Sequence, residues 1–497
     1  MTGSTKTASS ALDRVRHLLD QATEVYHSEP EVLTLLEELR RRLDEPLRVA
    51  LVGSVKAGKS TLLNALLGEH LAPTDARECT KVVTWYRHSA TPSVQAVHVV
   101  DGVVRLPLLR QDSRLELDLG HLDADTVERL DVAWPTSALT ELTLIDTPGT
   151  ASISTALSDR THQFVTPGGG VSGADAIVYL LRSLHASDVD FLRSLNDRAA
   201  GESAMGAIAV LSRADELGAG RLNAMATVGK AVDQLREDPT LESACETIVP
   251  VAGLLALAGE TLRQSEFTSL AALEALPPED LRSLLVSADR FISADGSNLP
   301  SPQVRAALMN RLGLFGVRLA VAMIRGGARD APTLAQELVQ HSGLEDLRRV
   351  IDVHFRRRHP QLKAHALVVA LQQLVVEHPL PGSAEILAAT DEHLADPHPF
   401  KEMKLLGRVR SSRLDLDRDD LHELERLLGG TGTSPSERLG VHASNPSSKT
   451  LRERAMTLLV KWHGLATNPL VDPDTADACR VAARSCEGIL AEIDHYD

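Results

Sequence analysis

The chain has 497 residues, of which 43% are hydrophobic and 24% charged, which is enough for two or three domains with their own cores. A net charge of -16 and an aromatic content of 3% argue against a nucleic-acid-binding protein, because such proteins need basic surface and stacking platforms. The four cysteines include no C-x-x-C pair, so neither a disulfide framework nor a zinc site is expected.

The first predicted element is helical, because residues 11–44 carry apolar side chains at helical spacing. The N-terminus lacks the apolar stretch of a signal peptide, and no run of 18 or more apolar residues occurs along the chain. We therefore expect a cytoplasmic protein, either soluble or peripheral at the inner face of the plasma membrane.

Residues 47 to about 255 alternate strand-like and helical runs. The strand-like runs are RVALVG, VVTWYR, VQAVHVV, LTLID, AIVYLL, AIAVLS and TIVPVA. Several are apolar at consecutive positions, as strands buried on both faces are, and the DG pair at 101–102 indicates a hairpin. This pattern predicts a mostly parallel sheet with an antiparallel pair at its edge.

The remainder of the chain is predicted to be helical. Beyond about residue 270 the sequence is rich in Leu and Ala and carries few strand signals. We expect residues 1–45 to form a helical segment that packs with the bundle, 46–275 the α/β domain, and 276–497 an all-α neck or trunk bundle.

A phosphate-binding loop is predicted after the first strand. The motif G-x-x-x-x-G-K-S/T opens a helix there, so its backbone N–H groups can surround phosphate oxygens while the lysine reaches the β- and γ-phosphates. The serine hydroxyl of this motif binds Mg²⁺. The loop residues expected to bind nucleotide are Gly53, Ser54, Val55, Ala57, Gly58, Lys59, Ser60 and Thr61.

A second motif, DTPG, follows the strand LTLID. The Asp146 carboxylate can hold the Mg²⁺ shell through water, and the Gly149 amide can sense the γ-phosphate. A threonine hydroxyl in the intervening loop could complete the Mg²⁺ shell only when the γ-phosphate is present. Thr80, Thr74 and Thr84 are the candidates, and the residues alone do not choose among them.

A third motif indicates guanine. In LSRAD the Asp215 carboxylate can accept both N1–H and N2–H₂ of guanine, a donor pair that adenine lacks. The usual motif is N/T-K-x-D, so Ser212 and Arg213 are departures, although Arg213 can still stack on the base. The alternative for Asp215 is a helix N-cap. Ala252 and Gly253 are expected to pack near the base.

These motifs resemble those of the bacterial dynamin-like GTPases, and within them the group of the mycobacterial isoniazid-inducible protein C. The similar stretches are GSVKAGKSTLLNALLG, LAPTDARECTKVV, LIDTPGT, LSRAD and PVAGLL. The resemblance covers nearly the whole chain and implies a P-loop GTPase domain with GTP or GDP and Mg²⁺, followed by a helical trunk.

The resemblance also selects residues. A proline seven residues before the switch threonine is typical of dynamins, so Pro73 favours Thr80 as the Mg²⁺ and catalytic threonine. Lys59 and Lys56 are the other expected catalytic residues. Lys56 lies where some large GTPases carry a catalytic arginine, and the alternative is that Lys56 is a solvated loop lysine.

The resemblance further implies slow intrinsic hydrolysis and pairing of two GTPase domains. Thr150 follows DTPG in place of a water-orienting glutamine. The segment LHASDVD resembles one that reaches a partner's nucleotide, which makes Ser187 and Asp188 candidate contacts across a homodimer. The alternative is an ordinary helix N-cap at Ser187. A related dynamin-like chain could also be the partner.

Membrane attachment is implied by the resemblance. The stretches 355–363 and 400–413 are locally basic, and the second mixes apolar with basic side chains, so it could lie on an anionic membrane surface. The alternative is a solvated bundle helix whose apolar side faces a core.

Overall fold

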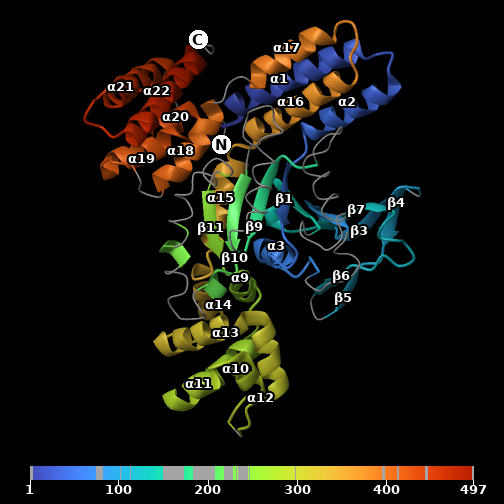
Figure 1. The fold of residues 1–497 in the computed structure, drawn as a ribbon, viewed down its shortest axis with the longest axis vertical. Coiled ribbons are helices and arrows are strands. Elements are labelled where there is room, and N and C mark those ends of the chain that lie inside the picture. The colour runs from blue at the N-terminus through green and yellow to red at the C-terminus, as the bar shows by residue number, and fades with distance from the viewer. Residues whose placement is uncertain are drawn as a thin grey trace.

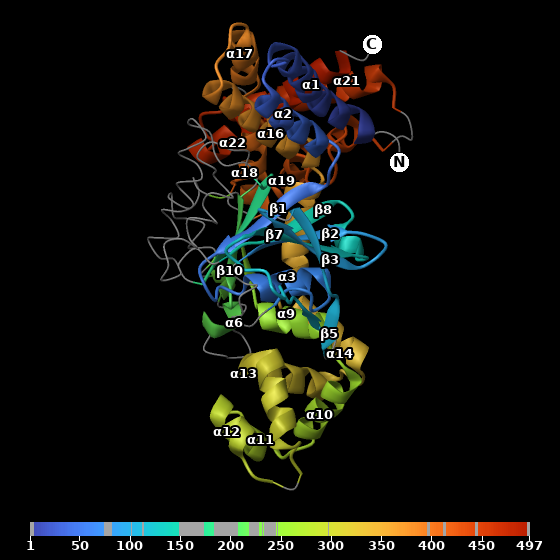
Figure 2. The ribbon, with the colours of Figure 1, turned by 90° about the vertical axis from the view of Figure 1, so that its right-hand side faces the viewer.

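The structure is a computed structural model. It describes residues 4–73, 82–100, 102–111, 114–148, 173–182, 207–217, 228–230, 232, 245, 247–296, 298–394, 398–410, 414–442 and 446–494. A central α/β domain lies between two groups of helices at one end and a smaller helical lobe at the other (Figures 1 and 2).

The central domain is built on a nine-stranded sheet. In sheet order the strands are β11 (Thr247–Val251), β10 (Ala207–Ser212), β9 (Ala176–Leu181), β1 (Leu47–Gly53), β8 (Leu142–Asp146), β2 (Val83–His88), β7 (Val127–Trp134), β3 (Ser93–His98) and β4 (Gly102–Leu106). The first five run parallel, β2 is antiparallel to β8, and β3 and β4 form the antiparallel hairpin at the edge. The predicted sheet is therefore confirmed.

One central strand, β7, was not among the predicted strands. It runs parallel to β2 and antiparallel to β3, so it joins the two halves of the sheet. Its sequence VERLDVAW alternates buried and more exposed positions, which is the period of a strand with one covered face. A short second sheet pairs β5 (Leu109–Gln111) with β6 (Arg114–Glu116).

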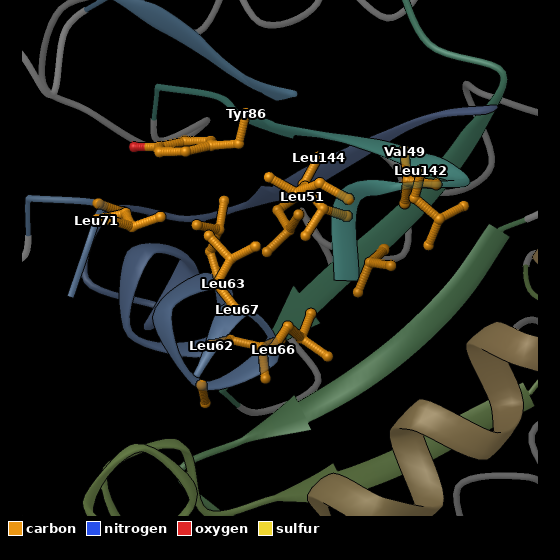
Figure 3. Close-up of a cluster of buried hydrophobic side chains, with 14 of the residues drawn as sticks. Val49, Leu51, Leu62, Leu63, Leu66, Leu67, Leu71, Tyr86, Leu142 and Leu144 are labelled. Atoms are coloured by element: carbon orange, nitrogen blue, oxygen red, sulfur yellow. The ribbon is translucent and has the colours of Figure 1, made fainter. Parts of the chain in front are cut away.

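Helix α3 (Lys59–Leu67) packs its leucines onto one face of this sheet (Figure 3). Leu62, Leu63 and Leu67 are buried against Val49 and other strand side chains of the same core. Burying one leucine side chain stabilises the fold by about 2 kcal/mol, because its apolar surface is removed from water. This packing holds the first residues of α3 at the carboxyl end of β1.

The lobe at the lower end in Figure 1 is called here the distal lobe. Helix α9 (Gly253–Glu260) connects it to the sheet, and a Cβ added to Gly259 would lie 2.7 Å from the side chain of Val339, so α9 and the lobe approach closely. The helices of the distal lobe are α10 (Gln264–Glu274), α11 (Pro278–Leu284), α12 (Ala288–Ser293), α13 (Pro302–Gly326) and α14 (Ala331–Gln340).

Helix α13 is long and apolar enough to cross a membrane by length and composition, and half of its most apolar window is buried. Gly313 interrupts the helix with non-helical angles of φ 66° and ψ 174°. Leu308, Leu312 and Phe315 lie in the core of the distal lobe. These features are typical of two consecutive core helices.

Two helical groups lie at the upper end of the molecule (Figure 1). The N-terminal bundle combines α1 (Ser4–Val25), α2 (Pro30–Arg42), α16 (His359–Glu377) and α17 (Ser383–Leu394) around one core. The C-terminal bundle contains α18 (His398–Arg410), α19 (Arg418–Leu427), α20 (Pro435–Leu439), α21 (Ser448–Ala466) and α22 (Pro473–Asp494). The predicted helical region after the α/β domain is confirmed, whereas the predicted domain limits remain predictions.

One segment contributes to three cores. Helix α15 (Leu344–Ile351) continues into the π-helical turn η3 (Asp352–Arg356), which precedes α16. Phe355 lies in the core of the central domain, Val353 in the C-terminal bundle, and Leu367 of α16 in the N-terminal bundle. This segment therefore connects the sheet to both upper groups of helices.

Candidate functional site

The loop between β1 and α3 has the backbone that a phosphate site needs. Gly58 precedes α3 in the left-handed conformation at φ 95°. A Cβ added to Gly53 would lie 2.6 Å from the carbonyl oxygen of Leu180 on the neighbouring strand. Both positions therefore favour glycine, which lets the chain turn tightly into the positive end of the α3 dipole.

The ammonium group of Lys59 lies inside this loop. Its Nζ atom donates to the carbonyl oxygens of Gly53 at 2.9 Å and Ser54 at 3.2 Å. Burial lowers the pKa of Lys59, while the Asp146 carboxylate opposes that change. A buried cation held by weak carbonyl acceptors would gain from meeting phosphate oxygens.

The structure brings Ser60 and Asp146 together at the ends of α3 and β8. The Ser60 hydroxyl donates to Asp146 Oδ2 at 2.8 Å. Asp146 Oδ1 is buried and accepts no hydrogen bond from any residue that the structure describes. Burial raises the pKa of Asp146, and Lys59 and the Ser60 hydroxyl oppose that rise. A buried oxygen with a free lone pair beside a hydroxyl fits a hard divalent cation such as Mg²⁺.

A cavity of about 130 Å³ lies next to the loop. Among the predicted residues it is lined by Ala57, Gly58, Thr61, Ser212, Arg213, Asp215 and Gly253. Asp215 is the second residue of the short helix α6 (Ala214–Leu217), so it lies in the first turn of that helix and not at its N-cap position. Burial raises the pKa of Asp215, and Glu216 adds to the rise.

Ser212 and Arg213, the two departures from the usual motif, both bond to neighbouring parts of the chain in the structure. The Ser212 hydroxyl donates to the Leu181 carbonyl on β9 at 3.0 Å rather than to the phosphate loop. Arg213 Nη2 donates to the Lys56 carbonyl at 3.1 Å, and Arg213 Nη1 donates to Glu216 at 2.8 Å. Arg213 therefore ties the end of β10 to the phosphate loop.

Lys56 itself adopts a left-handed backbone conformation at φ 63°, and both Val55 and Lys56 are exposed. Its side chain is therefore at the surface of the loop, and its proposed catalytic role stays a prediction. Ala252 is fully buried and donates its N–H to the Ser342 carbonyl at 2.8 Å, so it supports the cavity without lining it.

Some predicted residues lie outside the described part of the chain, and their roles remain predictions. They are Thr80 and its competitor Thr74, Gly149, Thr150, Ser187 and Asp188. Thr84 is described. It is 3% exposed in β2 and its hydroxyl donates to the Val82 carbonyl at 3.4 Å, so it is not in a loop.

The cavity is also lined by six residues that the sequence reasoning did not name, which are Leu62, Leu180, Val210, Glu216, Val251 and Leu254. Leu180 and Leu254 supply apolar surface, and Glu216 pairs with Arg213. Leu254 is 40% exposed and lies on the wall of the cavity. Its position two residues after Ala252 is the signal that could have found it.

Comparison with known proteins agrees with this geometry. The Dynamin family matches residues 49–203. The isoniazid-induced protein IniC of Mycobacterium tuberculosis is 40% identical over 97% of this chain and 99% of its own length. The chain belongs to the bacterial dynamin-like IniC family. The resemblance read from the motifs is thereby confirmed, and guanine nucleotides are the ligands of the dynamin GTPase family.

Two more distant relatives of this IniC-family chain match only part of it. The bacterial dynamin-like protein of Nostoc punctiforme is 29% identical over 27% of this chain and 20% of its own length. The isoniazid-induced protein IniA of Mycobacterium tuberculosis is 32% identical over 25% of this chain and 20% of its own length.

Proposed function

We propose that this IniC-family protein binds and hydrolyses GTP with Mg²⁺ and couples the reaction to conformational change and to peripheral membrane remodelling or maintenance. The observation that carries the proposal is the group of Lys59, Ser60 and Asp146, in which a buried carboxylate oxygen has no partner among the described residues. The cavity beside this group contains Asp215, the carboxylate suited to guanine.

Each part of the site has a distinct task in this proposal. The loop N–H groups from Gly53 to Ser60 and the ammonium of Lys59 hold the phosphates, and Asp215 accepts the two guanine donors. Ser60 and Asp146, with Thr80 as the resemblance implies, would hold Mg²⁺, which neutralises charge on the β- and γ-phosphates.

In this proposal, strand β11 transmits the conformational change from the nucleotide site to helix α15. Ala252 N–H donates to Ser342 O, and a Cβ added to Gly343 would lie 2.1 Å from the Pro250 carbonyl oxygen. The start of α15 is therefore pressed against the strand that ends at the nucleotide cavity. A shift of β11 would move α15, and α15 leads through η3 to both upper bundles.

Hydrolysis is proposed to be slow in the monomer and faster in a dimer of GTPase domains. Ser187 and Asp188 are the proposed contacts to the partner's nucleotide, and Lys56 is proposed to neutralise charge between the β- and γ-phosphates. Turnover per molecule should then rise with protein concentration. A flat specific activity across a hundredfold range would count against assembly, and Lys56→Ala with unchanged single-turnover hydrolysis would remove Lys56 from the proposal.

A second candidate is a soluble GTP-dependent scaffold that partners another dynamin-like chain. The burial of apolar side chains in one basic stretch, and of two basic side chains in the other, favours it. Met403, Leu405 and Leu406 of α18 are at most 3% exposed and lie in protein cores. In the other stretch, Arg358 is buried beside Glu402 and Lys363 is 1% exposed. The expectation that 400–413 offers an apolar face to a membrane is therefore wrong for this conformation.

The experiment that separates the two candidates is GTP turnover with and without anionic liposomes, with flotation of the protein measured in parallel. Flotation with stimulated turnover supports membrane remodelling. Turnover without flotation supports the scaffold and directs the search to a protein partner. Absence of GTP binding and of turnover in both arms would overturn the proposed enzyme.

A further inference from the structure

Helix α9 lies between the central domain and the distal lobe and contributes side chains to the cores of both. Ala256 and Leu257 belong to the core of the central domain, whereas Leu255 and Ala258 belong to the core of the distal lobe. Residues three apart lie on one face of a helix, so α9 presents one face to each part. Because cores are close-packed, α9 cannot shift without changing the packing of both.

Leu254, in the first turn of α9, lines the nucleotide cavity. Its side chain is 40% exposed, although the next residue, Leu255, is 1% exposed. A Cβ added to Gly253 would lie 3.6 Å from Thr61 Cγ2, so the start of α9 contacts the helix that follows the phosphate loop. The exposed part of Leu254 is therefore available for contact with a ligand in the cavity.

Leu254 also lies beside a break in α13. Gly313 interrupts that helix with φ 66° and ψ 174°, a conformation that is essentially restricted to glycine. A Cβ added to Gly313 would lie 4.0 Å from Leu254 Cδ1, which is ordinary van der Waals contact. Leu254 therefore reaches from the wall of the cavity to the point where α13 is interrupted.

Both halves of α13 are attached to α9. Before the break, Arg311 Nη2 donates to the carbonyl and hydroxyl oxygens of Thr261, the C-cap residue of α9, both at 2.9 Å. After the break, a Cβ added to Gly316 would lie 3.3 Å from Leu255 Cδ1, so the helices approach closely there as well. Hinges are residues that absorb changes in φ and ψ, and Gly313 has the conformational freedom for this role.

We propose that Leu254 packs against the nucleobase and that the base thereby sets the angle of α13 at Gly313, so that the distal lobe responds to bound nucleotide. This inference rests on the proposed function, because it requires a guanine nucleotide in the cavity. The faces of a base are largely apolar, so the base covers the exposed part of the leucine. Leu254 then loses freedom on the cavity side, and the flexible position beside it, Gly313, adjusts.

This connection is separate from the one through β11. The contact from Ala252 to Ser342 leads to α15 and the upper bundles, whereas the contact from Leu254 to Gly313 leads to the distal lobe. These two destinations lie at opposite ends of the molecule (Figure 1). The two contacts start only two residues apart in the chain, so a single ligand in the cavity affects both ends.

The test compares two ligands of the full-length protein, each with Mg²⁺. GDP carries a base, whereas tripolyphosphate occupies the phosphate loop without one. Amide hydrogen exchange is measured on peptides covering residues 308–316 of α13, and peptides of α21 report the overall stabilisation by the ligand. The variants are Leu254→Ala, Leu254→Met and, as the matched control, Val286→Ala, which changes a 65% exposed residue between α11 and α12 of the same lobe.

We expect saturating GDP to slow exchange in residues 308–316 by at least about tenfold beyond its effect on α21, in wild type and in Val286→Ala. Leu254→Ala should lose this additional protection, and Leu254→Met should recover most of it because the apolar contact is restored. Leu254→Ala should also bind GDP about fivefold more weakly, with unchanged affinity for tripolyphosphate. Tripolyphosphate should give no additional protection of α13 in any of the proteins.

The outcomes separate this inference from the proposed function. If wild type binds GDP but residues 308–316 are protected equally in wild type and Leu254→Ala, the connection through Leu254 is wrong and the GTPase remains. The same conclusion follows if tripolyphosphate protects α13 as strongly as GDP does. If wild type binds neither ligand, the proposed function fails and this inference fails with it.

Discussion

Two aspartates at opposite ends of the central sheet, Asp175 and Asp146, differ in how their oxygens are used. Asp175, just before β9, accepts from Arg42 Nη2 at 2.6 Å and from the Arg48 N–H at 2.9 Å, and Lys363 Nζ lies at 3.9 Å. Asp146, at the carboxyl end of β8, accepts from Ser60 and keeps Oδ1 without a partner among the described residues. Each aspartate has a buried carboxylate oxygen, so the burial of an oxygen alone does not distinguish a structural carboxylate from one that binds a ligand.

The partners around the two groups explain the difference. Asp175 joins α2, β1 and β9 to Lys363 of α16, whose ammonium also donates to the carbonyls of Arg42 at 2.8 Å and Pro46 at 3.1 Å. These bonds connect the sheet to the N-terminal bundle. Among the residues that the structure describes, Asp146 has the Ser60 hydroxyl as its hydrogen-bond partner and the Lys59 ammonium as its opposing charge, and both groups belong to the predicted phosphate and Mg²⁺ site.

The largest expected effect is on chemistry at the Asp146 end. Asp146→Asn should lower GTP turnover by about 10²–10³-fold, because the carboxylate that organises the Mg²⁺ site loses its charge. Single-turnover hydrolysis with excess Mg²⁺ measures this effect. The thermal stability of the ligand-free protein should fall much less than in Asp175→Asn, because a carboxylate is no longer buried and Lys59 keeps its bonds to the Gly53 and Ser54 carbonyls. Turnover within a few-fold of wild type would contradict the assignment.

The next effect is on stability at the Asp175 end. Asp175→Asn should lower the free energy of unfolding by about 3–5 kcal/mol, because Arg42 is left as a buried charge without its counterion. Urea unfolding measures this change, and Asp146→Asn is the matched control at the other end of the sheet. If Asp175→Asn and Asp146→Asn lower the free energy of unfolding by the same amount, the proposed difference between the two aspartates is wrong.

A smaller effect concerns Lys363. Burial lowers its pKa to about 8 from 10.5, although Asp175 opposes the change. Between these pH values the unfolded chain holds a proton that the folded chain has lost, so stability rises with pH. Between pH 8 and 10.5, the free energy of unfolding of the wild type should rise by roughly 2 kcal/mol more than that of Lys363→Met. Urea unfolding curves at three pH values measure this change. If the difference in free energy of unfolding between wild type and Lys363→Met is the same at all three pH values, the lowered pKa of Lys363 is contradicted.

The smallest expected effect is on GDP affinity, and it concerns Arg213 and Ser212 at the same end of the sheet as Asp146. Arg213→Ala should weaken GDP binding by about tenfold, because it removes the bond that ties β10 to the phosphate loop. Ser212→Ala should have a weaker effect, since its hydroxyl bonds to β9 instead. Titration with a fluorescent GDP analogue measures both. Equal losses in the two variants would mean that Arg213 does not hold the loop.

The features that could be predicted from sequence are those with local causes. The strand, glycine loop and helix around Gly58 and Lys59 are local, because tight turns and helix starts depend on neighbouring residues. Asp146 and Asp215 were also found, since each follows an apolar strand. The signal for β7 was present as an alternating pattern and was overlooked, because the prediction gave most weight to continuous apolar runs.

The features that could not be predicted depend on partners far along the chain. Nothing near Asp175 shows that Arg42 and Lys363 will surround it, and nothing near Arg213 shows that it will bond to Lys56. The face of α18 that seemed suited to a membrane is covered by elements from elsewhere in the chain. Tertiary contacts decide such cases, and the local pattern of basic and apolar residues is the same for both outcomes.

The π-helical turn η3 restricts the number of residues between α15 and α16 more strongly than it restricts which residues these are. Each residue advances an α-helix by about 100°, and a π-turn accommodates one additional residue. Deleting one residue between Asp352 and Arg356 would convert the turn to regular helix, which largely keeps the directions of the flanking segments but removes one position within the turn. Phe355 and Val353 would then no longer face their separate cores. Related chains can therefore vary the side chains of this turn far more readily than the number of its residues.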